Sequence, residues 1–180
     1  MISMTEGAAR ARRATGAMFF AVFGGLWIEG WASRSGAPAP AYVAIAVLAL
    51  ALLGVALFVY RRHAAALKAQ PDTPEGRRAR RVFHIVNAGQ WIAIFVLANV
   101  LVNVGLGAWV VPMIVMVVGL HMFPLAHVFA YPTHYVTGAA LCALALAYPG
   151  LAPAGPLDPA GMLGAGLILW ASAAWAVKRL

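Results

Sequence analysis

Three of the chain's five histidines lie within the segment GLHMFPLAHVFAYPTHYVTG, residues 119–138, together with two prolines. These are His121, His127 and His134, and His84 is expected at the same depth because it opens the preceding hydrophobic stretch. A neutral imidazole can bind haem iron, copper or zinc, and an imidazole that titrates near neutral pH can relay protons. Either task requires side chains from different helices at one depth.

The spacing of these histidines does not place them on one face of a regular helix. Residues six apart, as His121 and His127 are, point in directions that differ by about 120°. Pro124 lies between them, and a proline inside a helix removes a backbone hydrogen bond and favours a kink. The alternative is that His121 bonds a neighbouring carbonyl or amide, while His127 and His134 lie among the lipid headgroups.

The hydrophobic stretch that His84 opens also carries four amide side chains, Asn87, Gln90, Asn99 and Asn103. They spread over a wide arc of a helix, which predicts a central helix that contacts neighbours on several sides. The amides would either line a pathway or join helices by hydrogen bonds.

Glu29 is the single acid inside a predicted span, and Trp27 and Trp31 flank it. Turned inward, it would be a proton or cation site with Asn99 and Asn103 as partners at a comparable depth. Turned outward, it would be a solvated carboxylate in the aromatic belt of the membrane interface.

The composition indicates the elements that carry these residues. Of 180 residues, 63% are hydrophobic and 10% are charged, and the mean hydropathy is +0.85. This composition predicts an all-α integral membrane protein, with residues 1–180 forming a single transmembrane domain. Six stretches are long enough to span the bilayer, near residues 14–33, 41–60, 82–103, 106–129, 134–149 and 159–177.

Basic residues indicate the topology. They cluster at both ends of the chain and in the 61–81 loop, whereas Arg34 stands alone in the other connections. The positive-inside rule then predicts six transmembrane helices with both termini in the cytosol, in a multi-pass protein of the bacterial inner membrane. The first span is expected to be retained rather than cleaved as a signal peptide.

The 61–81 loop is predicted to extend the second span, turn at Pro71–Pro74 and start a helix with Thr73 as N-cap and Pro74 at its first position. Its arginines would fix the orientation or bind anionic lipid headgroups. No nucleic-acid partner is expected, because no reading module accompanies the basic residues.

Small residues at four-residue spacing predict tight helix packing, within one chain or in a homo-oligomer. Examples are Ala139, Ala143 and Ala147 in the fifth stretch, and Gly161 with Ala165 in the sixth.

The segment GLHMFPLAHVFAYPTHYVTG, with NAGQW before it and GLILWASAAWAV after it, resembles a group of small six-helix bacterial integral membrane proteins of uncharacterised activity. The resemblance extends over roughly residues 82–177. It implies a family fold, and it implies no activity and no site residue.

We expect the chain to pass or bind a small solute or ion, with His84, His121, His127 and His134 clustered in the cytosolic half. A haem- or metal-binding protein that uses these histidines is one alternative, and a structural or partner-binding scaffold is another. Enzymatic activity is not expected, since the chain lacks HExxH, a phosphate-binding glycine loop and a Ser-His-Asp constellation. No cofactor is expected, with haem or a transition metal as the alternative.

Overall fold

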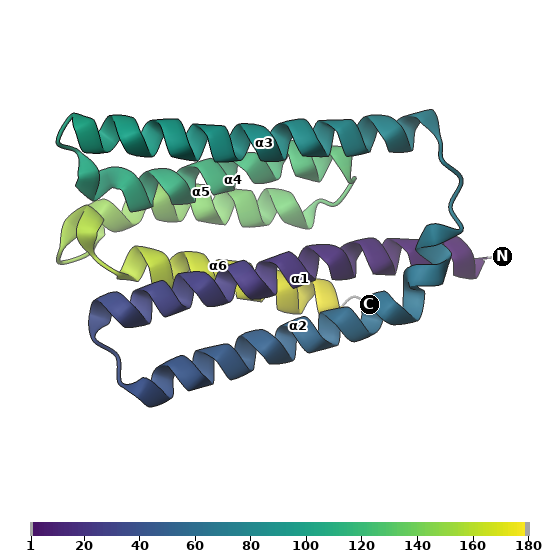
Figure 1. Cartoon of the computed structure of the whole chain (residues 1–180), viewed down its shortest axis with the longest axis horizontal. Coiled ribbons are helices and arrows are strands. Elements are labelled where there is room, and N and C mark those ends of the chain that lie inside the picture. The colour runs from purple at the N-terminus through teal and green to yellow at the C-terminus, as the bar shows by residue number, and fades with distance from the viewer. Residues whose placement is uncertain (1, 179–180) are drawn as a thin grey trace. The chain divides into compact units, whose positions relative to one another are not determined.

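The computed structural model describes residues 2–178, with side chains from residue 6 onward, and these residues form helices and no strand (Figure 1). The α-helices are α1 (Ile2–Ser35), α2 (Ala39–Lys68), α3 (Pro74–Asn103), α4 (Val110–Val128), α5 (Thr133–Leu151) and α6 (Ala160–Lys178). Two short 3₁₀ helices, η1 (Gly107–Trp109) and η2 (Gly155–Leu157), precede α4 and α6. Each predicted stretch coincides with one α-helix, so the all-α prediction is confirmed.

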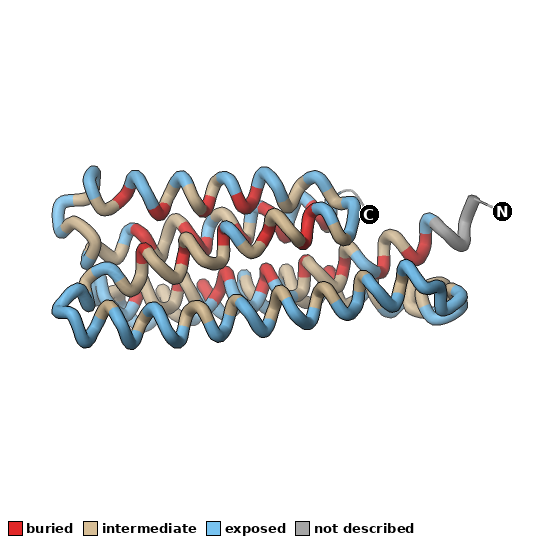
Figure 2. The backbone as a smooth tube through the Cα atoms, turned by 90° about the horizontal axis from the view of Figure 1, so that it is seen from above, coloured by how far each residue is buried: buried red, intermediate tan, exposed pale blue. Residues whose placement is uncertain are grey.

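Five of these helices, α2 to α6, are long and apolar enough to cross a membrane. Their large apolar side chains remain widely exposed, as at Phe58, Phe95 and Leu151. Exposed residues recur along the backbone in Figure 2. Such faces are unfavourable in water and suit a hydrocarbon environment. The helices therefore indicate a membrane-embedded protein. Helix α1 is 34 residues long but does not reach the same apolarity, because charged residues occupy both its ends.

The helices fall into two compact units, one comprising Met1–Pro71 and Gly166–Leu180 and the other Asp72–Ala165. In the first unit, α1 packs along α2 and along the second part of α6. The indole N–H of Trp170 in α6 donates to the Ala21 carbonyl of α1 at 3.0 Å. A Cβ added at Gly24 would collide with the same indole ring. The glycine therefore makes room for a tryptophan that joins α6 to α1.

In the second unit, α4 packs against α3 on one side and α5 on the other. The α4 and α5 backbones meet at two glycines. A Cβ added at Gly138 would lie 2.8 Å from the Gly119 carbonyl oxygen, and a Cβ added at Gly119 would lie 3.0 Å from the Gly138 carbonyl oxygen. Real Cβ atoms do not come this close to a backbone oxygen, so only glycine permits this crossing.

The small-residue prediction is only partly correct. Gly161 and Ala165 are buried in α6, with Gly161 against the Tyr148 ring of α5. The stripe of Ala139, Ala143 and Ala147 in α5 does not pack within the chain, since all three are exposed, and its packing between copies stays a prediction. The buried face of α5 follows a different set, Thr137, Gly138, Leu141, Ala145 and Tyr148.

The start of α3 matches its prediction. Thr73 is the N-cap, its hydroxyl accepts the Gly76 N–H at 3.1 Å, and Pro74 occupies the first helical position. The helix then continues without interruption to Asn103. The predicted central position of α3 is wrong, since none of its described residues is buried. Within the unit α3 packs mainly against α4, and two of its amides, Asn99 and Asn103, are exposed.

Alanine at Gly138 should destabilise the α4–α5 crossing. We expect Gly138→Ala to lower the free energy of unfolding by about 1–3 kcal/mol, because the backbones must separate to admit the methyl group. Thermal unfolding of the detergent-purified chain measures this loss as a fall in Tm.

Gly89 on α3 is the matched control, since a Cβ there meets nothing within 4 Å. Gly89→Ala should leave Tm unchanged or raise it, because alanine gains up to about 1 kcal/mol of helix propensity. Equal Tm values for the two variants would contradict a close crossing.

Candidate functional site

His121 on α4 and His134 on α5 lie together in the second unit. The two rings interact electrostatically, and both residues are half-buried. The Tyr131 ring packs edge-on against the His134 ring, with centroids 4.9 Å apart and an interplanar angle of 87°. The ring of His121 also lies close to the backbone of Val86 on α3. Three helices thus meet at the His121–His134 pair.

The turn between α4 and α5 positions Tyr131 and His134. Tyr131 N–H donates to the Ala126 carbonyl at 3.0 Å and Ala130 N–H to the His127 carbonyl at 3.3 Å, the pattern of a Schellman C-cap. Ala130 has a φ of 47°, a left-handed conformation that usually requires glycine. The tight turn brings α5 straight back along α4, which allows His134 to reach His121.

The other two predicted histidines differ from the pair in burial. His84 and His127 are exposed, and the His84 ring packs against the adjacent Phe83 ring, with centroids 5.5 Å apart. Among residues 2–178, no three His, Cys, Asp or Glu side chains are close enough together to hold a metal ion. Of the four histidines predicted to cluster, the described geometry therefore brings together His121 and His134.

The amides of α3 differ in exposure. Asn87 and Gln90 are half-buried, and Asn99 and Asn103 are exposed. Asn99 Nδ2 donates to the Phe95 carbonyl at 2.7 Å, and Asn103 Nδ2 donates to the Asn99 carbonyl at 2.8 Å. Each of these two amides thus satisfies a donor within its own helix, which lowers the cost of facing lipid.

Glu29 is half-buried on α1 and belongs to the first unit. Within the part of the chain that the structure describes, its carboxylate has no hydrogen bond and no ion pair. Its predicted partners Asn99 and Asn103 belong to the second unit. Their partnership with Glu29 stays a prediction.

Sequence reasoning missed the glycine crossing that positions the histidine pair. Gly119 lies two residues before His121 and Gly138 lies four residues after His134. The sequence did contain a signal for this crossing. On each of the two successive spans a glycine lies within about one helical turn of a histidine, and glycines allow two helix backbones to approach closely near those histidines.

A second polar feature lies where the 61–81 loop enters α3. The Asp72 carboxylate accepts hydrogen bonds from Arg80 Nη2 at 2.6 Å and from Arg77 Nη1 at 3.0 Å. The bond from Arg80, and to a smaller extent the bond from Arg77, holds the pKa of Asp72 below its ordinary value of 3.8. Beside them, an open hollow of about 510 Å³ is lined by Pro74, Arg77, Arg78, Arg81 and Val82.

An apolar groove of about 480 Å³ lies elsewhere in the second unit, between α3, α4 and α5. Leu97, Trp109, Met113 and Leu146 are among its lining residues, and no histidine borders it. Its apolar walls suit a hydrocarbon chain and offer no group for chemistry.

No protein-family model, curated protein or solved structure matches the chain. Function is therefore argued from the sites themselves and not by analogy of fold.

Asp72→Asn should loosen the first turns of α3, because Arg77 and Arg80 lose a charged acceptor. In the wild type, the ion pairs of Asp72 with Arg77 and Arg80 contribute their full stability above pH 3.8, the ordinary pKa of the carboxyl. This stability is lost as the pH falls through the lowered pKa of Asp72 in the folded chain. Hydrogen exchange of residues 74–82 should therefore be slower in the wild type than in the variant at pH 7. The two rates should converge in strong acid, and equal rates at pH 7 would contradict a structural role for this network.

Proposed function

We propose that the chain is a six-span protein of the bacterial inner membrane, with both termini in the cytosol, and that the His121–His134 pair binds a proton that controls passage of a small solute or ion. A single observation carries this function. Two half-buried imidazoles from successive helices lie near each other where three apolar helices meet, and the Tyr131 ring packs edge-on against one of them.

The packing of α1 supports counting it as the sixth span. Its face from Ala14 to Ile28 is buried at intervals of three and four residues against α2 and α6. Both of those helices have the length and apolarity of membrane spans. A helix packed along two spans over this length occupies the same layer of the bilayer.

The even number of spans also agrees with the basic residues. Six crossings place the arginines near the N-terminus, the 61–81 loop and Lys178 on one side of the membrane. That side is the cytosol by the positive-inside rule.

The pair suits proton binding because its two rings cannot carry charge independently. A proton on one imidazole makes a second proton on its neighbour unfavourable, so the pair takes up protons in two separate steps. Each step places a charge among apolar helices, where water screens it weakly.

A proton bound by the histidine pair can affect the neighbouring helices through the backbone groups that lie beside it. The His121 ring lies close to the Val86 backbone of α3, so a charge on this ring acts on the contact between α3 and α4. Pro124 lies inside α4, and it leaves the Leu120 carbonyl without its usual helical donor. That carbonyl, directly beside His121, is an acceptor for a proton carrier or a water molecule.

The topology is tested with single cysteines in a Cys142→Ala background, using right-side-out membrane vesicles and a membrane-impermeant maleimide. Cysteines at Ser35 and Ala154 should react at once, and a cysteine at Ala69 should react only after the vesicles are permeabilised. Immediate labelling at Ala69, or protection at Ser35, would exclude the six-span arrangement.

The histidine pair is tested by proton and solute flux in liposomes that contain the purified chain. Wild-type flux should depend on pH, because the charge of the pair changes as it gains or loses its shared proton. His121→Phe and His134→Phe should reduce flux to the level of protein-free liposomes, because neither leaves two imidazoles to share a proton.

His127→Phe is the matched control, since His127 is exposed and outside the pair. It should retain wild-type flux. The proposal fails if the wild type shows no flux at any pH tested, or if His127→Phe loses as much flux as His121→Phe while both variants keep their Tm.

A further inference from the structure

We propose that the arginine hollow, the surface formed by Pro74, Arg77, Arg78, Arg81 and Val82, seats the headgroup of an anionic phospholipid. This inference is independent of the histidine pair. The hollow has a volume of about 510 Å³ and lies where the charged start of α3 gives way to its apolar part. Its lining combines three arginines with the apolar Pro74 and Val82, as an amphipathic ligand at a membrane surface requires.

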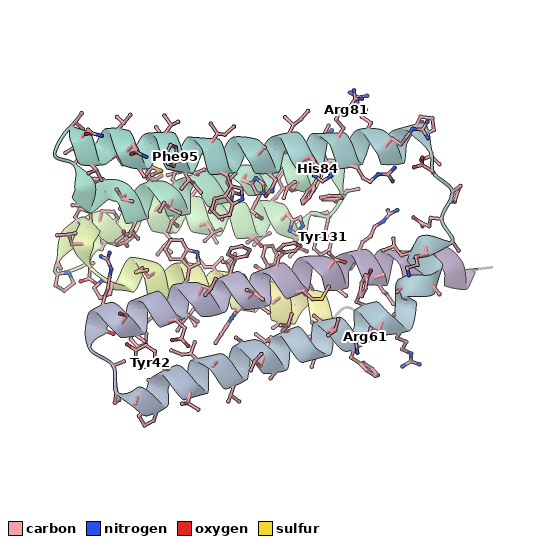
Figure 3. The ribbon with its side chains drawn as sticks, in the orientation of Figure 1. Tyr42, Arg61, Arg81, His84, Phe95 and Tyr131 are labelled. Atoms are coloured by element: carbon pink, nitrogen blue, oxygen red, sulfur yellow. The ribbon has the colours of Figure 1, made fainter. Side chains whose placement is uncertain are left out.

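Charge complementarity identifies the ligand as an anion. Residues 72–82 contain four arginines against Asp72 and Glu75, which leaves a net charge of +2. Asp72 is already bonded to Arg77 and Arg80. Within the described residues, Arg78 and Arg81 have no ion-pair partner, and Figure 3 shows the Arg81 side chain pointing away from α3. Two guanidinium groups are thus available for a phosphate oxygen.

The binding groups are side chains and not the helix backbone. Two N–H groups in the first turn of α3 already have partners, since Gly76 N–H donates to the Thr73 hydroxyl and Arg77 N–H donates to the Thr73 carbonyl. The anion would therefore be held by guanidinium groups, which can bind two phosphate oxygens at once.

The neighbouring face of α3 favours a lipid over a soluble phosphate. Ile85 and Ile92 follow Arg81 by four and eleven residues, so all three share one face of the helix. The exposed fractions of Ile85 and Ile92 are 63% and 64%. A phospholipid with its phosphate at Arg81 would lay its acyl chains along this apolar face, whereas free phosphate would leave it uncovered.

Thermal unfolding of the full chain in an uncharged detergent tests the proposal with three additives. Dioctanoyl phosphatidylglycerol should raise Tm in a concentration-dependent manner, because a ligand that binds the folded state stabilises it. Dioctanoyl phosphatidylcholine, which carries the same chains without net charge, should raise Tm much less. Inorganic phosphate should also have little effect, and a rise equal to that with phosphatidylglycerol would show a free-phosphate site and overturn the lipid assignment.

Two double variants locate the site. Arg78→Gln/Arg81→Gln should abolish the Tm rise caused by phosphatidylglycerol. Arg61→Gln/Arg62→Gln removes the same charge from exposed positions near the end of α2 and should keep the full rise. Equal losses in the two variants would mean a general charge effect and overturn the proposal. If the first double variant does not fold, Arg78→Gln and Arg81→Gln are measured singly, and an undiminished rise in both overturns it equally.

Discussion

The close crossing of α4 and α5 at Gly119 and Gly138 is the contact on which the second unit depends. Lipid provides no hydrophobic force between helices, so association relies on dispersion contacts that weaken quickly with distance. The two glycines let the backbones approach until a carbonyl of one helix occupies the place of a side chain on the other. Because the helices are antiparallel, residues after Gly119 face residues before Gly138, and this register brings His121 to His134.

Polar groups within these apolar helices are accommodated in two ways. Asn99 and Asn103 turn back onto carbonyls of their own helix, which costs little and requires no neighbour. His121 and His134 instead interact across helices, where a change of charge on one ring affects another helix. We therefore place function at the histidine pair and regard the exposed amides as locally satisfied side chains.

Local signals predicted much of the fold. Thr73 and Pro74 start α3 as predicted. Gly36 and Gly105, which were not singled out from the sequence, follow the ends of α1 and α3 with positive φ values of 67° and 79°. The turn between α4 and α5 has no such signal, because Ala130 takes the left-handed position that glycine usually fills. The packing of α4 against α5 imposes this conformation, so the identity of residue 130 alone does not predict it.

The sequence by itself determined the helical, apolar character of this protein, the approximate extent of each helix and the positions of its arginines. These properties follow from hydropathy, helix capping and charge, which act over a few neighbouring residues. Only the tertiary structure decided that His121 lies near His134 while His84 and His127 stay exposed, and that α3 has no buried residue. It also decided that α5 buries Gly138, Leu141 and Ala145 and leaves Ala139, Ala143 and Ala147 exposed. Those outcomes depend on which backbones can approach most closely, and that distance is a property of two helices together.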